Sequence, residues 1–213
     1  MFSITLKAGQ WRAIIESVSN LTSSDKARRP ILTAVCIKCD EDGARFTATD
    51  SYIVGTISAA ANGDGATVTG AGSVLLEPKR LGDCVKVVTD YYGTTAKTTG
   101  IPVTLEFDGI TASVFLKGSN ADPIRAEIVE GTYPNTDTLL NMGEGTNSRV
   151  SFSPVVLGRL TSALTAFHGG KKSAITASAC FTFFDNGRPC TVTARNGSLG
   201  LEFIGGIMPV RVS

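Results

Sequence analysis

The chain repeats one pattern three times: a short β-rich run, an amphipathic helix and about three further β-rich segments. Equivalent apolar positions on the three helices are Trp11, Leu81 and Leu157, which lie 70 and 76 residues apart. One such unit cannot bury both its helix and its sheet, whereas two units can do so by joining their sheets with both helices on one face. The pattern predicts an α+β fold built from strand-helix-strand-strand-strand repeats.

Helical periodicity defines the three helices. Apolar residues recur in each of them at spacings of three and four, or three and seven, which places them on one helix face. These residues are Trp11, Ile14, Ile15 and Val18 in the first helix, Leu81, Cys84, Val85 and Val88 in the second, and Leu157, Leu160, Leu164 and Phe167 in the third. Ser153 and Pro154 are typical of a helix start, and Gly169-Gly170 of a helix end.

Strands are expected before and after each helix. The runs before the helices are Phe2 to Leu6, Ser73 to Leu76 and Arg149 to Phe152. The β-rich segments after them are residues 31–39, 45–49 and 51–58 in the first repeat, 103–107, 111–117 and 125–129 in the second, and 180–184, 189–194 and 199–212 in the third. Turn residues at 40–43 and 108–109 predict hairpins, and the small, glycine-rich residues 59–72 predict a flexible connection.

The repeats predict one complete domain and one half-domain. Residues 1–142 hold two repeats, at 1–60 and 73–133, which are joined by a linker at 61–72. Residues 148–213 form the third repeat, which has no internal partner. We therefore expect the third repeat to be completed by another subunit, so that the protein self-associates.

Charge is sorted by position along the chain. The sequence has 20 basic and 19 acidic residues, for a net charge of +1. The helices with their flanks carry +2 over residues 10–30, +2 over 78–97 and +4 over 149–172, which leaves −7 for the remainder. Any one helix could carry such charges simply as a solvated face, but the bias shared by all three favours a basic surface for a polyanion.

Binding of DNA by these helices should not depend on base sequence. Each helix offers only a few cations, and none has the Asn, Gln and Arg side chains of a base-reading surface. We expect modest affinity that weakens with salt, with log K falling by about 0.9 for each phosphate neutralised.

Composition excludes several other classes of protein. Hydrophobic residues make up 42% and charged residues 18% of the 213-residue chain, as in ordinary globular proteins. No apolar run is long enough to span a bilayer, and the N-terminal sequence lacks the order of a signal peptide. Five cysteines without a disulfide-like spacing are typical of a reducing compartment. We expect an intracellular, cytoplasmic protein.

No group of residues favours catalysis or metal binding. Cys36 and Cys39 have a C-x-x-C spacing, but they lie within a strand and lack a second ligand pair, so we interpret them as strand cysteines. His168, the only histidine, sits at a helix end, where a structural role is commoner than catalysis. The acidic run at 40–42 is interpreted as a solvated hairpin tip, and the glycines of residues 63–72 match no phosphate-binding loop. We expect no enzyme, no catalytic residues, no metal and no cofactor.

Four short segments occur in a fixed order. They are Arg29–Val35 (RPILTAV), Phe46–Asp50 (FTATD), Tyr133–Asn135 (YPN) and Ile207–Arg211 (IMPVR). In this order the chain resembles the bacterial-type DNA polymerase III sliding clamp, the β subunit of the replicative polymerase, and the likeness runs in register along most of the chain.

The resemblance implies a clamp ring with sheets outside and helices lining a central hole. Such a ring encircles double-stranded DNA without sequence specificity and acts as a processivity factor in DNA replication. Matching positions would place Arg28, Arg29, Lys79 and Arg80 against the DNA, and the charge argument adds Arg12, Arg159, Lys171 and Lys172.

The resemblance also implies an apolar pocket for short peptides from the DNA polymerase and the clamp loader. Carried onto this chain, the pocket would comprise Leu32, Thr49, Tyr52, Val54, Pro134, Leu139, Met208, Pro209, Val210 and Arg211. A Met-lined aliphatic patch at a chain terminus suits varied partners.

The chain is shorter than the subunits of that family, which have three complete domains. It resembles their middle domain and the last half-domain. Because twelve repeats close the family's ring, three repeats per chain predict a homo-tetramer. A compact clamp of this kind would suit a phage. The alternative is a clamp-like interaction protein or decoy that binds the polymerase or a host clamp without encircling DNA.

Overall fold

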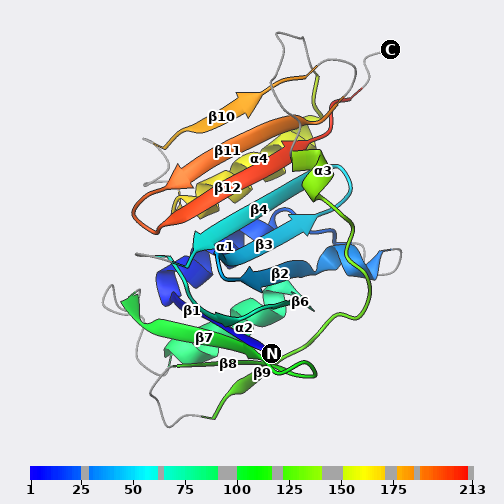
Figure 1. The fold of residues 1–213 in the computed structure, drawn as a ribbon. Helices are drawn as coiled ribbons and strands as arrows, with labels where there is room; N and C mark the ends of the chain where they lie inside the picture. Colours follow the sequence, from blue (N-terminus) through cyan, green and yellow to red (C-terminus); the bar gives the residue numbers. More distant parts are fainter. Residues whose placement is uncertain are drawn as a thin grey trace.

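A computed structural model describes residues 1–24, 29–61, 65–90, 100–116, 122–140, 151–170, 177–184 and 188–210. In these residues the strands form two antiparallel sheets, and α1, α2 and α4 lie together on one side of them (Figure 1). The helices are α1 (Ala8–Ser19), η1 (Pro30–Thr33, a 3-10 helix), α2 (Pro78–Asp90), α3 (Asp137–Leu140) and α4 (Pro154–Phe167). The strands are β1 (Phe2–Lys7), β2 (Val35–Asp40), β3 (Gly43–Thr49), β4 (Ile53–Ala60), β5 (Thr67–Gly70), β6 (Gly72–Leu76), β7 (Pro102–Phe107), β8 (Ala112–Leu116), β9 (Ile124–Ala126), β10 (Ala179–Thr182), β11 (Cys190–Asn196) and β12 (Leu201–Ile207).

The first two repeats exchange their first strands. Strand β1 precedes α1 but pairs with β7 of the second repeat, and β6 precedes α2 but pairs with β2 of the first. The sheet orders are β5-β1-β7-β8-β9 and β10-β11-β12-β4-β3-β2-β6. The second of these joins the third repeat to the first, because β12 pairs with β4. Both sheets are therefore shared between repeats.

Helix α1 is the centre of the core, with α2 on one side and α4 on the other. Trp11 is fully buried, its Nε1 donates to the Val103 carbonyl at 2.9 Å, and its ring meets the edge of Phe46 at 5.6 Å. Ser17 Oγ donates to the Ala163 carbonyl on α4 at 2.9 Å. The predicted apolar faces of the three helices are buried as expected, except that Leu157 is half-buried and the side chain of Val88 lies outside the described residues.

Two segments differ from the prediction between residues 30 and 76. Residues 31–33 are not strand, because Pro30 starts a 3-10 turn in which Thr33 Oγ1 donates to the Pro30 carbonyl at 2.7 Å. The expected flexible connection is wrong for residues 67–70. Strand β5 forms there because β1 offers it an open edge, and the Ser3 and Thr69 hydroxyls meet at 2.6 Å.

The third repeat also differs at its ends. Arg149 and Val150 lie outside the described residues, while Ser151 and Phe152 belong to no strand. The Ser151 carbonyl instead accepts from Val210 N at 2.7 Å. Strand β12 ends at Ile207, so residues 208–210 are not part of the expected strand. Ser153 occupies the N-cap of α4, as predicted, but its side chain makes no capping hydrogen bond.

Four of the five cysteines are buried. Cys36 and Cys39 lie on β2, as predicted, and belong to two different apolar clusters, Cys39 in the main core and Cys36 in a small cluster with Ala34 and Leu75. All five cysteines are free thiols, and only Cys180 is exposed. Among the described residues, no helix is both long and apolar enough to cross a membrane.

Candidate binding pocket and helix surface

A small apolar hollow of about 120 Å³ lies where η1, β4 and the end of β12 meet residues 134–136. Six of the ten residues predicted for the peptide pocket line it: Leu32, Thr49, Tyr52, Val54, Pro134 and Met208. Leu32 and Val54 are buried and form its apolar floor, whereas Met208 and Tyr52 are 39% and 65% exposed and form its rim. The hollow therefore has a buried base and exposed hydrophobic edges.

The turn between β3 and β4 positions Tyr52. Asp50 Oδ1 accepts from Tyr52 N at 2.9 Å and from Ile53 N at 3.0 Å, and Thr49 Oγ1 donates to the Ile53 carbonyl at 2.8 Å. Ser51 takes a left-handed backbone conformation, with φ of 83°, to close this turn. The result is a tightly bonded loop that directs the Tyr52 ring outward.

The chain end is tied to the same turn. Met208 N donates to the Tyr52 carbonyl at 2.9 Å, which sets Met208 against the rim. Of the remaining predicted pocket residues, Pro209 and Val210 follow Met208 beside the hollow without lining it, and Val210 is 49% exposed. Arg211 and the side chain of Leu139 lie outside the described residues.

The tyrosine of the YPN segment points away from the hollow. Tyr133 packs with Ala34, Cys36 and Leu75, and burial raises the pKa of its phenol. Its neighbours Pro134, Asn135 and Thr136 are the residues that line the hollow. Tyr133 therefore anchors the segment behind the pocket wall and is not a contact for a ligand.

Arg159 of α4 reaches the back of the Tyr52 turn. Its Nη1 forms an ion pair with Asp50 Oδ2, while Nε and Nη2 donate to the carbonyls of Asn20 at 3.1 Å and Thr22 at 2.9 Å. The Asp50 side chain is 9% exposed. One oxygen of this carboxylate therefore accepts hydrogen bonds from the turn, and the other forms the ion pair with α4. From its charge, Arg159 was expected to contact DNA. In the structure its guanidinium group binds Asp50 and two carbonyls of the same chain.

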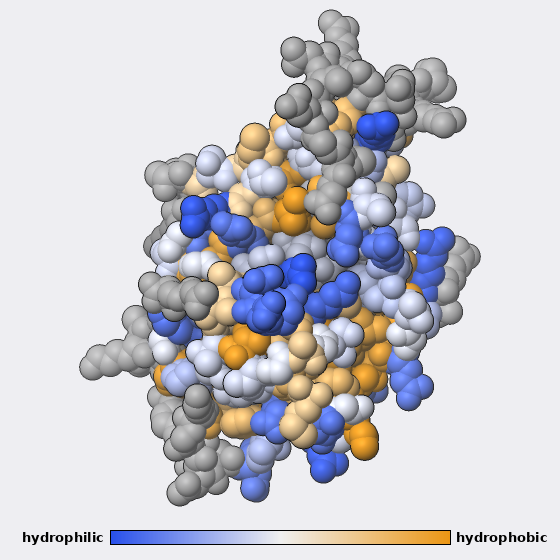
Figure 2. Space-filling model, viewed as in Figure 1, coloured by the Kyte–Doolittle hydropathy of each residue, from blue (hydrophilic) through white to orange (hydrophobic). Residues whose placement is uncertain are grey.

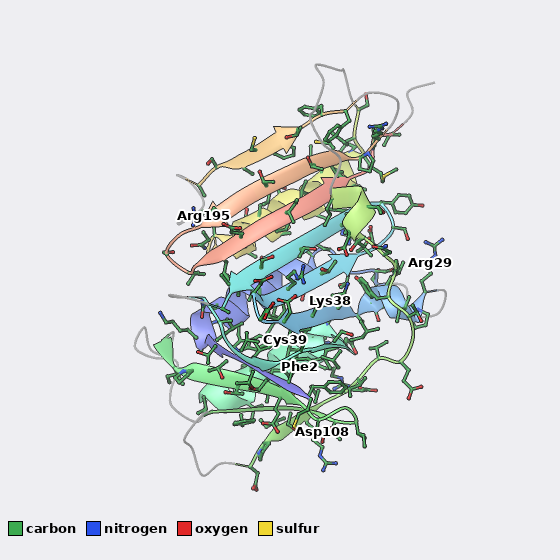
Figure 3. All side chains as sticks on the ribbon, viewed as in Figure 1. Phe2, Arg29, Lys38, Cys39, Asp108 and Arg195 are labelled. Carbon is green, nitrogen blue, oxygen red and sulfur yellow. The ribbon has the colours of Figure 1, made fainter. Side chains whose placement is uncertain are left out.

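The other predicted cations fall into three groups. Arg12 on α1 and Lys79 and Arg80 on α2 are exposed on the helices. Arg12 also lines a groove between α1 and α2, together with Ala8, Ile15, Glu16, Gly82, Val85, Lys86 and Asp90. Arg29 lies beside η1 at one margin of the molecule, where its Nη1 donates to Ser51 Oγ at 2.6 Å, while Arg195 lies at the opposite margin on β11 (Figure 3). Arg28, Lys171 and Lys172 lie outside the described residues.

Several solved structures match almost the whole length of this chain in fold. The β subunit from DNA polymerase of Streptococcus pyogenes matches with a TM-score of 0.67 at 19% identity, over 98% of this chain and 65% of that chain. The DNA polymerase sliding clamp from Bacillus subtilis matches with a TM-score of 0.69 at 16% identity, over 99% and 64% respectively. No protein-family model matches the sequence, and no curated protein matches it.

The chain has the fold of a DNA polymerase sliding clamp. It spans a little under two thirds of the Streptococcus pyogenes subunit, and the match covers 98% of this chain. Figure 2 views the strand side of this sliding-clamp fold and shows hydrophilic residues spread across it. The candidate DNA surface is on the other side, where the helices lie.

Six further residues line the hollow and were missed by sequence reasoning. They are Ser51, Ile53, Asn135, Thr136, Pro189 and Gly206. Asn135 stands in the YPN segment and could have been included from it. Gly206 is opposite Val54 in the β4–β12 pairing, which the sequence did not reveal. Pro189 follows residues 185–187, outside the described part, and no pattern in the sequence indicated it.

Proposed function

We propose that this chain is a DNA sliding clamp that encircles duplex DNA and tethers a replicative DNA polymerase as a non-catalytic processivity factor. The observation that carries the proposal is the layer of α1, α2 and α4 on one side of sheets that continue from repeat to repeat. A layer of this kind can be extended by further copies into a closed surface, with helices inside and strands outside. The match to solved sliding clamps over 98% of the chain supports this arrangement.

DNA would be held by the helix side without base readout. Arg12, Lys79 and Arg80 are exposed there and supply positive charge, and Arg28, Lys171 and Lys172 are proposed to add to it. Arg29 would contribute from the margin. Because Arg159 is paired with Asp50, we assign it a weaker contribution than the charge count alone suggested. Contacts of this type act on phosphates and permit sliding along the duplex.

The apolar hollow would hold the peptides of a polymerase and of a clamp loader. Its buried floor excludes water, and the exposed Met208 and Tyr52 can close over an apolar side chain. The open tail Met208–Val210 would form one wall of this site. A single pocket of this kind would serve alternative partners one at a time.

Assembly follows from the number of repeats. We propose that residues 1–142 form a complete clamp domain and that residues 148–213 form a half-domain, which another subunit completes. Four chains would supply twelve repeats and close the ring. Such a ring has a mass of about four times the 22.2 kDa of one chain.

Retention on circular DNA tests the function. The protein is loaded with a clamp loader on a nicked circular plasmid and passed through a sizing column in high salt. An encircling clamp stays with the circle and is released when a restriction enzyme linearises it. A decoy that binds only proteins, or a protein that simply adheres to DNA, gives the same elution for circular and linear plasmid, and this result would overturn the proposal.

A further inference from the structure

Two pairing rules operate between the repeats of this chain. In the first, a strand that follows a helix receives as neighbour the first strand of another repeat: β2 pairs with β6, and β7 pairs with β1. In the second, the last strands of two repeats pair with each other, as β4 and β12 do from Ile53↔Ile207 to Ala59↔Leu201. The first repeat satisfies both rules within the chain.

The third repeat satisfies only the second rule. Strand β10 follows α4 and is the counterpart of β2 and β7, yet among the described strands its one neighbour is β11. Phe181 on β10, and Phe152 and Phe183 beside it, remain only partly buried, and the rings of Phe152 and Phe183 pair at 6.3 Å. This edge therefore lacks an exchanged first strand.

The second repeat satisfies only the first rule. Strand β9 is its last strand and the counterpart of β4 and β12, and its one neighbour among the described strands is β8. β9 and β10 lie at opposite ends of the molecule (Figure 1). The two ends of the molecule thus lack different strand partners among the described strands, so that one end cannot complete the other.

We propose that each end of the molecule pairs with the same end of a second copy. The third repeat pairs with a third repeat, and the second repeat pairs with a second repeat. This inference rests on the proposed ring and names the contacts that close it. Among the described strands, only another third repeat has an unused exchange position, and only another second repeat has an unused last strand. Both contacts are isologous, which means that the same surface of each copy meets itself. A molecule with two such contacts closes into a ring of four copies with dihedral symmetry.

The helix surfaces agree with this arrangement. The α1–α2 groove uses the positions four, seven and eight residues after the first residue of each helix, which are Arg12, Ile15 and Glu16 on α1 and Gly82, Val85 and Lys86 on α2. The same positions on α4 are Gly158, Thr161 and Ser162, all exposed. An isologous contact brings like residues together, and this face of α4 carries no charge that would repel its own copy.

The exposed hydroxyls of that face are already satisfied. Thr161 Oγ1 and Ser162 Oγ both donate to the Gly158 carbonyl at 2.9 Å. Burying the face against a second α4 would therefore leave no hydroxyl donor unpaired. Small side chains at these positions also allow close approach of the two helices.

The other contact has a matching signal on α2. In the α1–α4 contact, Ser17 Oγ donates to the Ala163 carbonyl, and each of these residues is the ninth after its helix start. The same position on α2 is Val87, an apolar side chain that is 58% exposed. In a contact between two second repeats, Val87 would meet Val87 of the second copy, which accounts for its exposure in the single chain.

Cysteine crosslinking tests the inference in the full chain. Cys180→Ser first removes the exposed thiol. Ser162→Cys and Val87→Cys are then made singly in this background, and Ile110→Cys, at a position that is 84% exposed on a hairpin, serves as the control. Like-with-like pairing predicts that each of the first two variants gives a covalent dimer in high yield on mild oxidation, and that the control does not. The double variant Ser162→Cys/Val87→Cys should give a covalent species of four chains.

A head-to-tail ring gives the opposite pattern. Neither single variant would crosslink alone, but a mixture of the two, one carrying a mass tag, would give a tagged heterodimer, and this result would overturn the inference while leaving a ring on DNA intact. A crosslinker-resistant 22.2 kDa monomer would overturn it as well. Conversely, efficient like-with-like crosslinks without retention on circular plasmid would keep the inference and remove the clamp function. Unchanged circular dichroism of the reduced variants confirms that they fold.

Discussion

Arg159 of α4 and Asp50 of the β3–β4 turn form an ion pair that connects the helix layer to the rim of the apolar hollow. Asp50 binds Arg159 through Oδ2 and holds the Tyr52 amide through Oδ1. A single carboxylate thereby links the third repeat to the first and shapes the pocket at the same time.

Substitution of Asp50 should be costly to stability. Asp50→Asn keeps an acceptor for the turn but leaves the partly buried Arg159 without its counter-charge, and we expect unfolding in urea to become easier by about 2–4 kcal/mol. The matched control is Asp40→Asn, which breaks the exposed Asp40–Arg45 pair on a hairpin and should change stability by less than about 1 kcal/mol. Equal effects of the two variants would show that the Asp50 pair has no special role.

Met208→Ala should weaken peptide binding without affecting assembly. The side chain forms part of the pocket rim but is not in the core, so we expect the Kd of a fluorescent peptide taken from a replicative polymerase to rise by about 5–30-fold, equivalent to about 1–2 kcal/mol. Fluorescence anisotropy measures the affinity, and light scattering measures the mass. Ile110→Ala, on a hairpin outside the lining, is the control. An unchanged Kd for Met208→Ala would remove the pocket assignment.

Cations on the helix side should determine the salt dependence of DNA binding. Arg12→Ala, and separately Lys79→Ala, should lower affinity for duplexes of any sequence and reduce the slope of log K against log salt by about 0.9 each. Arg195→Ala on β11 removes an equally exposed charge from the strand side, near Glu202, and should leave the slope unchanged. Should Arg195→Ala act like Arg12→Ala, the DNA would not be confined to the helix side.

One thiol of five should react rapidly in the folded chain. Burial raises the pKa of Cys36, Cys39 and Cys84, and that of Cys190 to about 11, so at neutral pH these groups hold less thiolate than a free cysteine. Cys180 is exposed. Ellman's reagent at pH 7.5 should therefore titrate a single fast equivalent, which Cys180→Ser abolishes. A second fast equivalent would show that one of the four buried sites opens readily.

The helices and most strands could be predicted because their signals are local. Spacing of Trp11, Ile14, Ile15 and Val18 is enough to define one buried face, and the Asp108 turn encodes its own hairpin through hydrogen bonds to Ile110 N and Thr111 N. Strand β5 was missed because its stability comes from the edge of β1, more than sixty residues away along the chain at Ser3 and Thr69. Long-range pairing of this kind leaves little trace in composition.

Six of the ten residues expected at the pocket lie together in the structure, whereas the expected cations are more scattered, for a related reason. Leu32, Thr49, Pro134 and Met208 belong to the short segments that carry the resemblance, and within each segment the spacing between residues is fixed. Charge counting along the sequence could not tell that Arg159 would turn inward, because the carboxylate that receives it lies 109 residues away on the first repeat. A cation is less available to a ligand when the fold gives it a buried carboxylate as partner, as Asp50 does for Arg159.

The exchange of first strands has a consequence for synthesis of the protein. Strand β1 is synthesised before β7, so residues 2–7 cannot pair with this neighbour until residues 102–107 have been made. Until then, β1 with its apolar residues Phe2, Ile4 and Leu6 has only β5 as a possible strand neighbour among the described strands. A chaperone that shields β1 during this interval would be expected to raise the yield of native protein.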